Sequence, residues 1–142
     1  MRHLIFTTMF FALNLPAIAE SPARDEISKL RFAASQHEII TILIEEQNYA
    51  GVLPEFRRIL KLDLKGERNE KLIVKSAWAI VEQLSEARQY ALAHQILEET
   101  LEQTENRENR FSLLMLKGKT LKDEGRLREA IEVYRKAQAL QD

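Results

Sequence analysis

The chain has 142 residues, which allows one compact domain and leaves no room for a separate catalytic module. It contains no cysteine, so disulfides, thiolate zinc sites and thiol redox chemistry are excluded. With 45% apolar and 30% charged residues the composition is that of a globular chain, and the formal net charge of -1 provides no basic excess for nucleic acid. Only 4 glycines and 3 prolines, among abundant Leu, Ala, Glu, Lys and Arg, indicate helices throughout.

The first nineteen residues have the layout of a secretory signal peptide. A basic start at Arg2 precedes an apolar stretch over residues 4–15, and small residues stand at Ala17 and Ala19. We expect cleavage after Ala19, which leaves residues 20–142 as a periplasmic or secreted chain without stable membrane insertion. The alternative, an uncleaved anchor, is disfavoured because the apolar stretch is shorter than the ~20 residues that a bilayer requires.

Apolar residues at helical spacing predict six helices after this segment. Their stripes run over residues 27–44, 53–62, 72–84, 92–101, 111–121 and 127–137. The first helix should end near Gln47, and the second should begin near Leu53, because Pro54 is tolerated only in a first turn. The polar stretch 65–69 is predicted to be a loop, and Gly125 a sharp turn. Successive helices would pair into three hairpins.

The three hairpins are related by an internal repeat. Residues 48–53 superpose on residues 89–94 with an offset of 41 positions. A further offset of 37 places Leu84, Ala93, Leu97 and Thr100 on Leu121, Ala130, Tyr134 and Ala137. The units cover approximately residues 33–66, 74–106 and 111–142, and three units are the minimum for a stable stack.

The third unit resembles a tetratricopeptide repeat. The residues at that family's spacings are Leu114, Gly118, Leu121, Gly125, Ala130, Tyr134 and Ala137. The resemblance implies an all-α fold of about three antiparallel hairpins stacked as a right-handed superhelix. Gly118 and Ala130 would be small where the two helices cross, and Tyr134 would fill the space beside the next helix. The earlier units depart from the pattern, with Val81 and Ile40 at the position of Gly118.

The resemblance also implies that the first helix of each unit lines a groove that binds a peptide. Transferred residue by residue, this groove contains His37, Thr41, Trp78, Glu82, Met115, Lys119 and Lys122. Trp78 either anchors a partner's side chain or lies in the core between helices. Lys119 and Lys122 either pair with a partner's carboxylates or form a solvated face. These residues do not reproduce the family's set that clamps a C-terminal carboxylate, so that mode is not predicted.

Nothing in the sequence predicts catalysis, a metal or a cofactor. The two histidines beyond the signal segment, His37 and His94, are 57 positions apart and belong to no metal-binding pattern. His94 is interpreted as a surface or packing histidine. Adjacent carboxylates such as Glu98 and Glu99 point about 100° apart on a helix, so they cannot share a reaction centre. No glycine-rich phosphate loop or Gly-x-Ser-x-Gly motif occurs.

The sequence therefore favours a non-enzymatic module that binds a protein or peptide, as a periplasmic adaptor or assembly factor for a complex of the cell envelope. The alternative is a self-associating structural subunit, and an unrecognised small envelope enzyme is a third class. Because the chain stops after the sixth helix, we expect an uncovered apolar flank that includes Leu127, Ile131 and Leu140. A second copy, giving a homodimer, or another partner could cover it.

Overall fold

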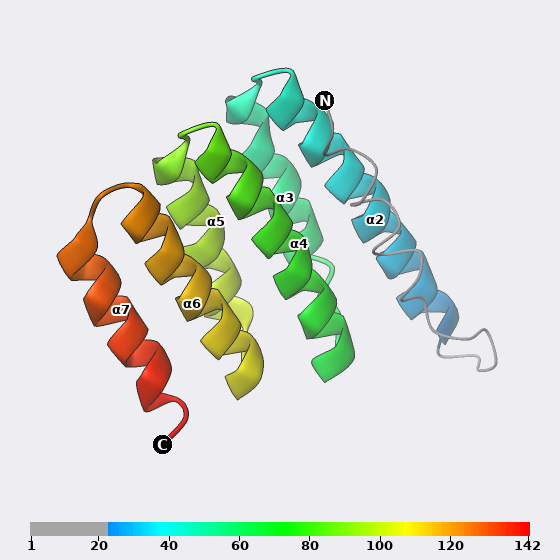
Figure 1. Ribbon diagram of the computed structural model, residues 1–142. Helices are drawn as coiled ribbons and strands as arrows, with labels where there is room; N and C mark the ends of the chain where they lie inside the picture. The colour runs from blue at the N-terminus through cyan, green and yellow to red at the C-terminus, as the bar shows by residue number, and fades with distance from the viewer. Residues whose placement is uncertain (1–22) are drawn as a thin grey trace. The chain divides into compact units, whose positions relative to one another are not determined.

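The computed structural model describes residues 23–142, so the predicted signal peptide, residues 1–19, lies outside the described part of the chain. Within residues 23–142 the fold is all helix, with six α-helices and one short 3-10 helix and without a strand, which confirms the predicted fold class (Figure 1). The elements are α2 (Ala23–Glu45), η1 (Tyr49–Gly51), α3 (Val52–Leu60), α4 (Glu67–Glu86), α5 (Tyr90–Gln103), α6 (Arg107–Asp123) and α7 (Leu127–Ala139).

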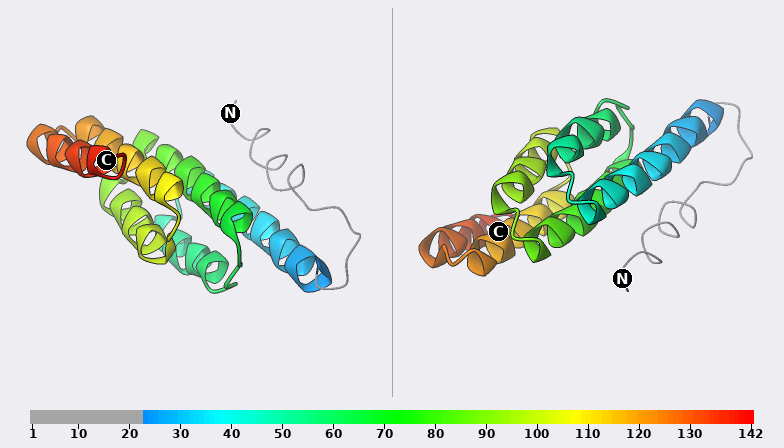
Figure 2. Two further views of the ribbon diagram at one scale, coloured as in Figure 1. Left: turned by 90° about the horizontal axis from the view of Figure 1, so that it is seen from below. Right: turned by 90° about the horizontal axis from the view of Figure 1, so that it is seen from above.

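The chain divides into two compact units between Lys65 and Gly66. The first unit contains one hairpin, in which α2 packs on α3. The second contains the hairpins α4–α5 and α6–α7, and α6 lies beside both α4 and α5 (Figures 1 and 2). Two hairpins are therefore stacked within the second unit, and α6 is the helix that joins them.

In the hairpin of the first unit, the second helix begins at a point that places Pro54 in its first turn. The 3-10 helix ends at Gly51 and α3 begins at Val52, so Pro54 lies in the first turn of α3, where its missing N–H breaks no helical bond. The predicted loop over residues 65–69 is partly wrong. Gly66 adopts φ 90 and α4 begins at Glu67, so three of the polar residues form a helical first turn.

One backbone geometry recurs at the turns of all three hairpins. Gln47, Arg88 and Gly125 have positive φ values of 58, 59 and 87, and they are separated by the offsets of 41 and 37 that the sequence comparison gave. At each turn the next N–H donates back to a carbonyl five residues earlier: Asn48 to Leu43, Gln89 to Leu84 and Arg126 to Leu121, each at 2.8 Å. This is the Schellman motif of a helix C-terminus, and it reverses the chain in the same way three times.

The α6–α7 hairpin packs a large residue against a small one. Gly118 on α6 is buried against the ring of Tyr134, and Leu121, Ala130 and Val133 form the core beside this contact. The small residues Gly118 and Ala130 thus lie where the two helices of the hairpin pack together, as predicted. Tyr134 fills space within its own hairpin, against Gly118, whereas the sequence placed it beside a following helix.

The connection between α5 and α6 is held by Glu70 in the first turn of α4. The carboxylate of Glu70 accepts hydrogen bonds from the backbone N–H of Glu105 at 3.1 Å and of Asn106 at 3.0 Å, and from Nδ2 of Asn109 at 2.9 Å. Asn106 in turn caps α6, because its side-chain oxygen accepts from the N–H of Asn109 at 3.0 Å. One carboxylate therefore ties the start of α6 to the first turn of α4.

Candidate partner-binding surface

The second unit brings together three of the residues that the sequence assigned to a groove. Trp78 and Glu82 lie one turn apart on α4, so their side chains share a face of that helix. Nε1 of Trp78 donates to Oε1 of Glu82 at 3.0 Å, and Nζ of Lys119 on α6 approaches the same oxygen at 3.2 Å. A single carboxylate oxygen thus links an aromatic side chain and a lysine from two different helices.

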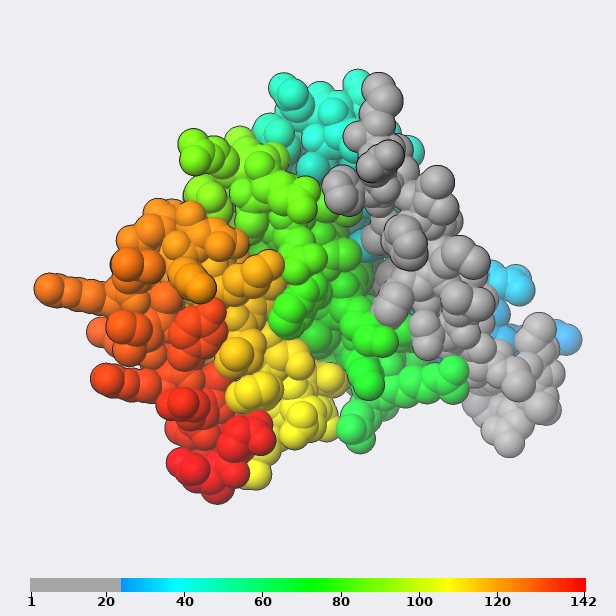
Figure 3. Space-filling model, viewed as in Figure 1, coloured from blue at the N-terminus to red at the C-terminus, as the bar shows by residue number. Residues whose placement is uncertain are grey.

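The neighbouring residues of α6 extend this surface. Met115 lies one turn before Lys119 and Lys122 lies one turn after it, and all three side chains are exposed. Trp78 is half-buried, so one part of its ring packs and another part is accessible. Figure 3 shows α4, in green, and α6, in yellow to orange, on one face of the second unit. We call this surface, made of Trp78, Glu82, Met115, Lys119 and Lys122, the α4–α6 groove.

A hollow of about 230 Å³ continues the groove toward the start of α5. It is lined by Glu82, Ser85, Glu86, Tyr90, Leu116, Lys119, Thr120 and Asp123. The hydroxyl of Tyr90 donates to the carbonyl oxygen of Asp123 at 3.4 Å, which closes one side of the hollow. This extension was not predicted from the sequence, although Glu86 and Asp123 follow Glu82 and Lys119 by one helical turn, a spacing that indicates it.

His37 and Thr41 do not lie on an accessible surface, so their assignment to the groove is wrong. Their exposed fractions are 1% and 2%, and they share the buried face of α2 with Ile40 and Ile44. The hydroxyl of Thr41 donates to the carbonyl oxygen of His37 at 3.1 Å, which satisfies it within the helix. Burial lowers the pKa of His37 to about 4, because desolvation disfavours the charged imidazolium.

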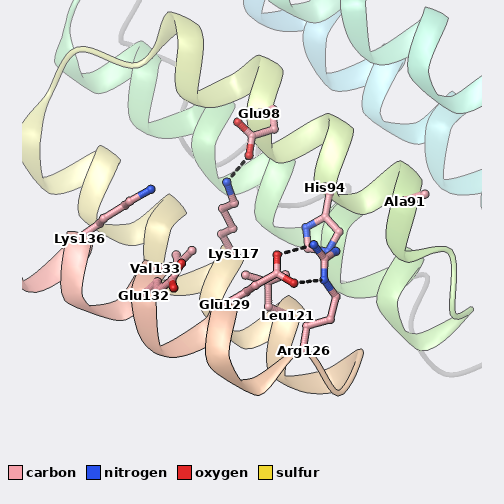
Figure 4. A pocket seen from close by; sticks show the side chains of 10 residues that line it. All are labelled: Ala91, His94, Glu98, Lys117, Leu121, Arg126, Glu129, Glu132, Val133 and Lys136. Atoms are coloured by element: carbon pink, nitrogen blue, oxygen red, sulfur yellow. Dashed lines mark hydrogen bonds and ion pairs between the residues drawn. The ribbon is translucent and has the colours of Figure 1, made fainter.

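A second hollow, of about 410 Å³, lies between α5, α6 and α7 and was not predicted (Figure 4). Its lining residues are Ala91, His94, Glu98, Lys117, Leu121, Arg126, Glu129, Glu132, Val133 and Lys136. Figure 4 shows Lys117 directed at Glu98 and Arg126 directed at Glu129, and both contacts are ion pairs. We call this hollow the α5–α7 pocket.

The charges around the α5–α7 pocket are largely neutralised by one another. Nε2 of His94 lies 2.8 Å from Oε2 of Glu124, the C-cap residue of α6. His94 therefore packs against the end of α6, and packing was one of the two roles expected from the sequence. This hydrogen bond, assisted by Arg126, lowers the pKa of Glu124. The bond to Arg126 likewise lowers the pKa of Glu129, and both carboxylates raise the pKa of Arg126. Glu124, Glu129 and Arg126 are thus held in their charged forms, which suits structural pairing.

No group of three or more His, Asp or Glu side chains in residues 23–142 is arranged to hold a metal ion. Among the same residues no helix has both the length and the apolar character needed to cross a membrane. Comparisons of the chain with protein-family models, with curated proteins and with solved structures give no significant match.

Proposed function

We propose that this chain is a non-enzymatic interaction module that binds a segment of another protein along the α4–α6 groove. The observation that carries the proposal is the shared oxygen of Glu82, which holds Trp78 and Lys119 at one place on the surface. An aromatic ring, an acid and a base from two helices thereby converge on one patch. Such a combination of a rigid apolar anchor with charged groups is typical of protein recognition sites.

The chemistry of the groove favours a partner with an apolar side chain next to an acidic residue. Trp78 and Met115 offer apolar contact, while Lys119 and Lys122 offer two cations on consecutive turns of α6. The pair Lys119–Glu82 is solvent-exposed, and exposed ion pairs contribute little stability. A partner's carboxylate can therefore replace Glu82 at Lys119 with little loss, and Lys122 can bind a second acidic group.

The wider proposal is a periplasmic adaptor or assembly factor with tetratricopeptide-like hairpins. Export rests on residues 1–19, and the family resemblance rests on the third hairpin, whose packing of Gly118 against Tyr134 supports it. A non-catalytic role is supported by the pairing of titratable groups around the α5–α7 pocket. These features together favour a protein that binds a partner and catalyses no reaction.

The test is cross-linking in cells of the exported chain, followed by affinity isolation from the envelope fraction. Wild type is compared with Trp78→Ala and Lys119→Glu, and Gln95→Ala, an exposed position on α5, is the matched control. The proposal expects one dominant partner with wild type and with the control, and its loss with both groove variants at unchanged helix content. Equal recovery of that partner by all four proteins would overturn it, as would recovery of the chain alone.

A further inference from the structure

An apolar stripe on α7 is uncovered. Leu127 and Ile131 lie one turn apart with exposed fractions of 59% and 51%, and the exposed Arg128 and Arg135 lie beside them. Leu140, which the sequence grouped with them, is half-buried. Single exposed apolar residues are common on protein surfaces, but two in adjacent turns form a contiguous patch that marks a contact site.

The equivalent residues of α5 already form an interface inside this chain. The offset of 37 places Leu127, Ile131 and Arg135 on Tyr90, His94 and Glu98. All three of these contact α6: Tyr90 with Asp123 at 3.4 Å, His94 with Glu124 at 2.8 Å, and Glu98 with Lys117. The stripe on α7 therefore stands at positions equivalent to those through which α5 contacts α6, the next helix of the stack.

The residues of α2 supply the matching surface. The offsets of 41 and 37 together place Lys117, Asp123 and Glu124, at the C-terminal end of α6, on Ile39, Glu45 and Glu46, at the C-terminal end of α2, 78 positions earlier. Ile39 and its neighbour Ile42 are exposed, with fractions of 43% and 51%, and Glu45 and Glu46 are exposed as well. At the positions where Lys117, Asp123 and Glu124 meet α5, the first unit thus carries Ile39, Glu45 and Glu46, and Ile42 lies one turn after Ile39.

We propose that α7 of one copy binds α2 of a second copy, head to tail, in the way that α5 binds α6 within the chain. In the internal interface the start of α5 lies at the end of α6, because Tyr90 meets Asp123. The same orientation places Leu127 of one copy at Glu45 of the next and Ile131 at Glu46, with Arg128, the residue after Leu127, beside these carboxylates. Two bases, Arg128 and Arg135, flank the stripe on α7, and two acids, Glu45 and Glu46, lie at the end of α2. Each face contributes two exposed isoleucine or leucine side chains.

Such an interface is heterologous, so it uses different surfaces on the two copies and leaves one of each kind free at the ends. It predicts a series of oligomers that grows with concentration, or a closed ring, and it is independent of the α4–α6 groove. Because each face exposes only two apolar side chains, we expect weak, concentration-dependent association.

Sedimentation velocity of the full chain over a range of concentrations tests this proposal. Ile131→Glu places a carboxylate opposite Glu46, and Ile42→Lys places a cation one turn from Ile39, which the same register sets opposite Arg135, so each variant should weaken association at least tenfold. Each variant keeps one intact face. A mixture of the two should therefore form a dimer of one copy of each variant and nothing larger, whereas either variant alone stays monomeric.

Helix content measured by circular dichroism checks that the variants fold, and Gln95→Lys, on the exposed side of α5, should associate like wild type. The double change Arg128→Glu with Glu46→Arg should restore association that either single change weakens. Trp78→Ala should leave the assembly unchanged, which separates this result from the groove. A wild-type chain that is monomeric at every concentration would overturn the proposal. So would normal association of Ile42→Lys, because α7 would then bind something other than α2.

Discussion

The ring of Tyr134 lies so close to Gly118 that a methyl group added to the glycine would be 2.5 Å from Cε1 of the ring. Real carbon atoms do not approach so closely, and Cδ1 and Cζ of the same ring would lie at 2.8 Å. The contact joins α6 to α7 beside the core of Leu121, Ala130 and Val133. The distance between the two helices of this hairpin is therefore set by the absence of a side chain at residue 118.

Gly118→Ala is expected to destabilise the chain by about 1–3 kcal/mol, because overpacking outweighs the gain of about 1 kcal/mol in helix propensity. Urea unfolding followed by circular dichroism measures this. Adding Tyr134→Leu to Gly118→Ala should recover part of the loss, since the crowding ring is removed. Tyr134→Phe in the same background should recover nothing, because it keeps all the ring atoms that clash. An unchanged or higher midpoint for Gly118→Ala would contradict the packing.

Glu70→Ala is expected to loosen the start of α6. It removes the acceptor of three hydrogen bonds, from the N–H groups of Glu105 and Asn106 and from Asn109, and should cost about 1–3 kcal/mol in the free energy of unfolding. Glu67→Ala is the matched control, because it removes an exposed carboxylate from the same first turn of α4. The control should lose less than about 0.5 kcal/mol. Equal losses would mean that Glu70 acts only through the helix dipole.

Two of the three hairpin turns carry a residue that is poorly suited to its backbone conformation. Gln47 and Arg88 are exposed and adopt φ values of 58 and 59. The equivalent position of the third turn is occupied by a glycine, Gly125. A side chain costs roughly 1 kcal/mol in this left-handed region. Gln47→Gly and Arg88→Gly should therefore stabilise the chain by about that amount, and Gly125→Ala should destabilise it similarly. Thermal unfolding of the three variants checks the signs, and a destabilising Arg88→Gly would show that the side chain has another role.

Patterns within a helix and positions related by the repeat could be predicted from the sequence, and side-chain pairs that follow neither rule could not. The six helices, the start of α3 before Pro54, and the small residue at Gly118 all follow from local spacing. Trp78 and Glu82 were placed on one face for the same reason, and Lys119 joined them through the repeat register.

The errors have one physical cause. The repeat register gives the direction in which a side chain points, and it says nothing about how deeply the surface there is covered. His37 and Thr41 have the same register as Trp78 and Glu82, and they are buried. The pair His94–Glu124 spans 30 positions and two helices, so no local pattern could indicate it. Burial depth and such distant pairs depend on the packing of whole hairpins.

The buried His37 predicts how stability changes with pH. Its pKa is about 4 in the folded chain and near 6.5 in the unfolded chain, so between these values the unfolded state binds more protons. The free energy of unfolding should therefore fall as pH falls from about 6.5 to about 4. The contribution of this one group is roughly 3 kcal/mol over that interval. Urea unfolding at pH 7 and at pH 4.5 measures the change.

His37→Gln isolates this effect, because glutamine keeps a polar side chain at the position and does not titrate. The carboxylates whose pKa values are lowered, Glu124 and Glu129, also lose stabilising interactions in acid, but they do so equally in both proteins. Only the difference between wild type and His37→Gln reports on the imidazole. We expect the variant to lose markedly less stability between pH 7 and pH 4.5, and an NMR titration should show His37 still neutral at pH 5. Parallel pH profiles of the two proteins would mean that His37 accepts a proton without unfolding.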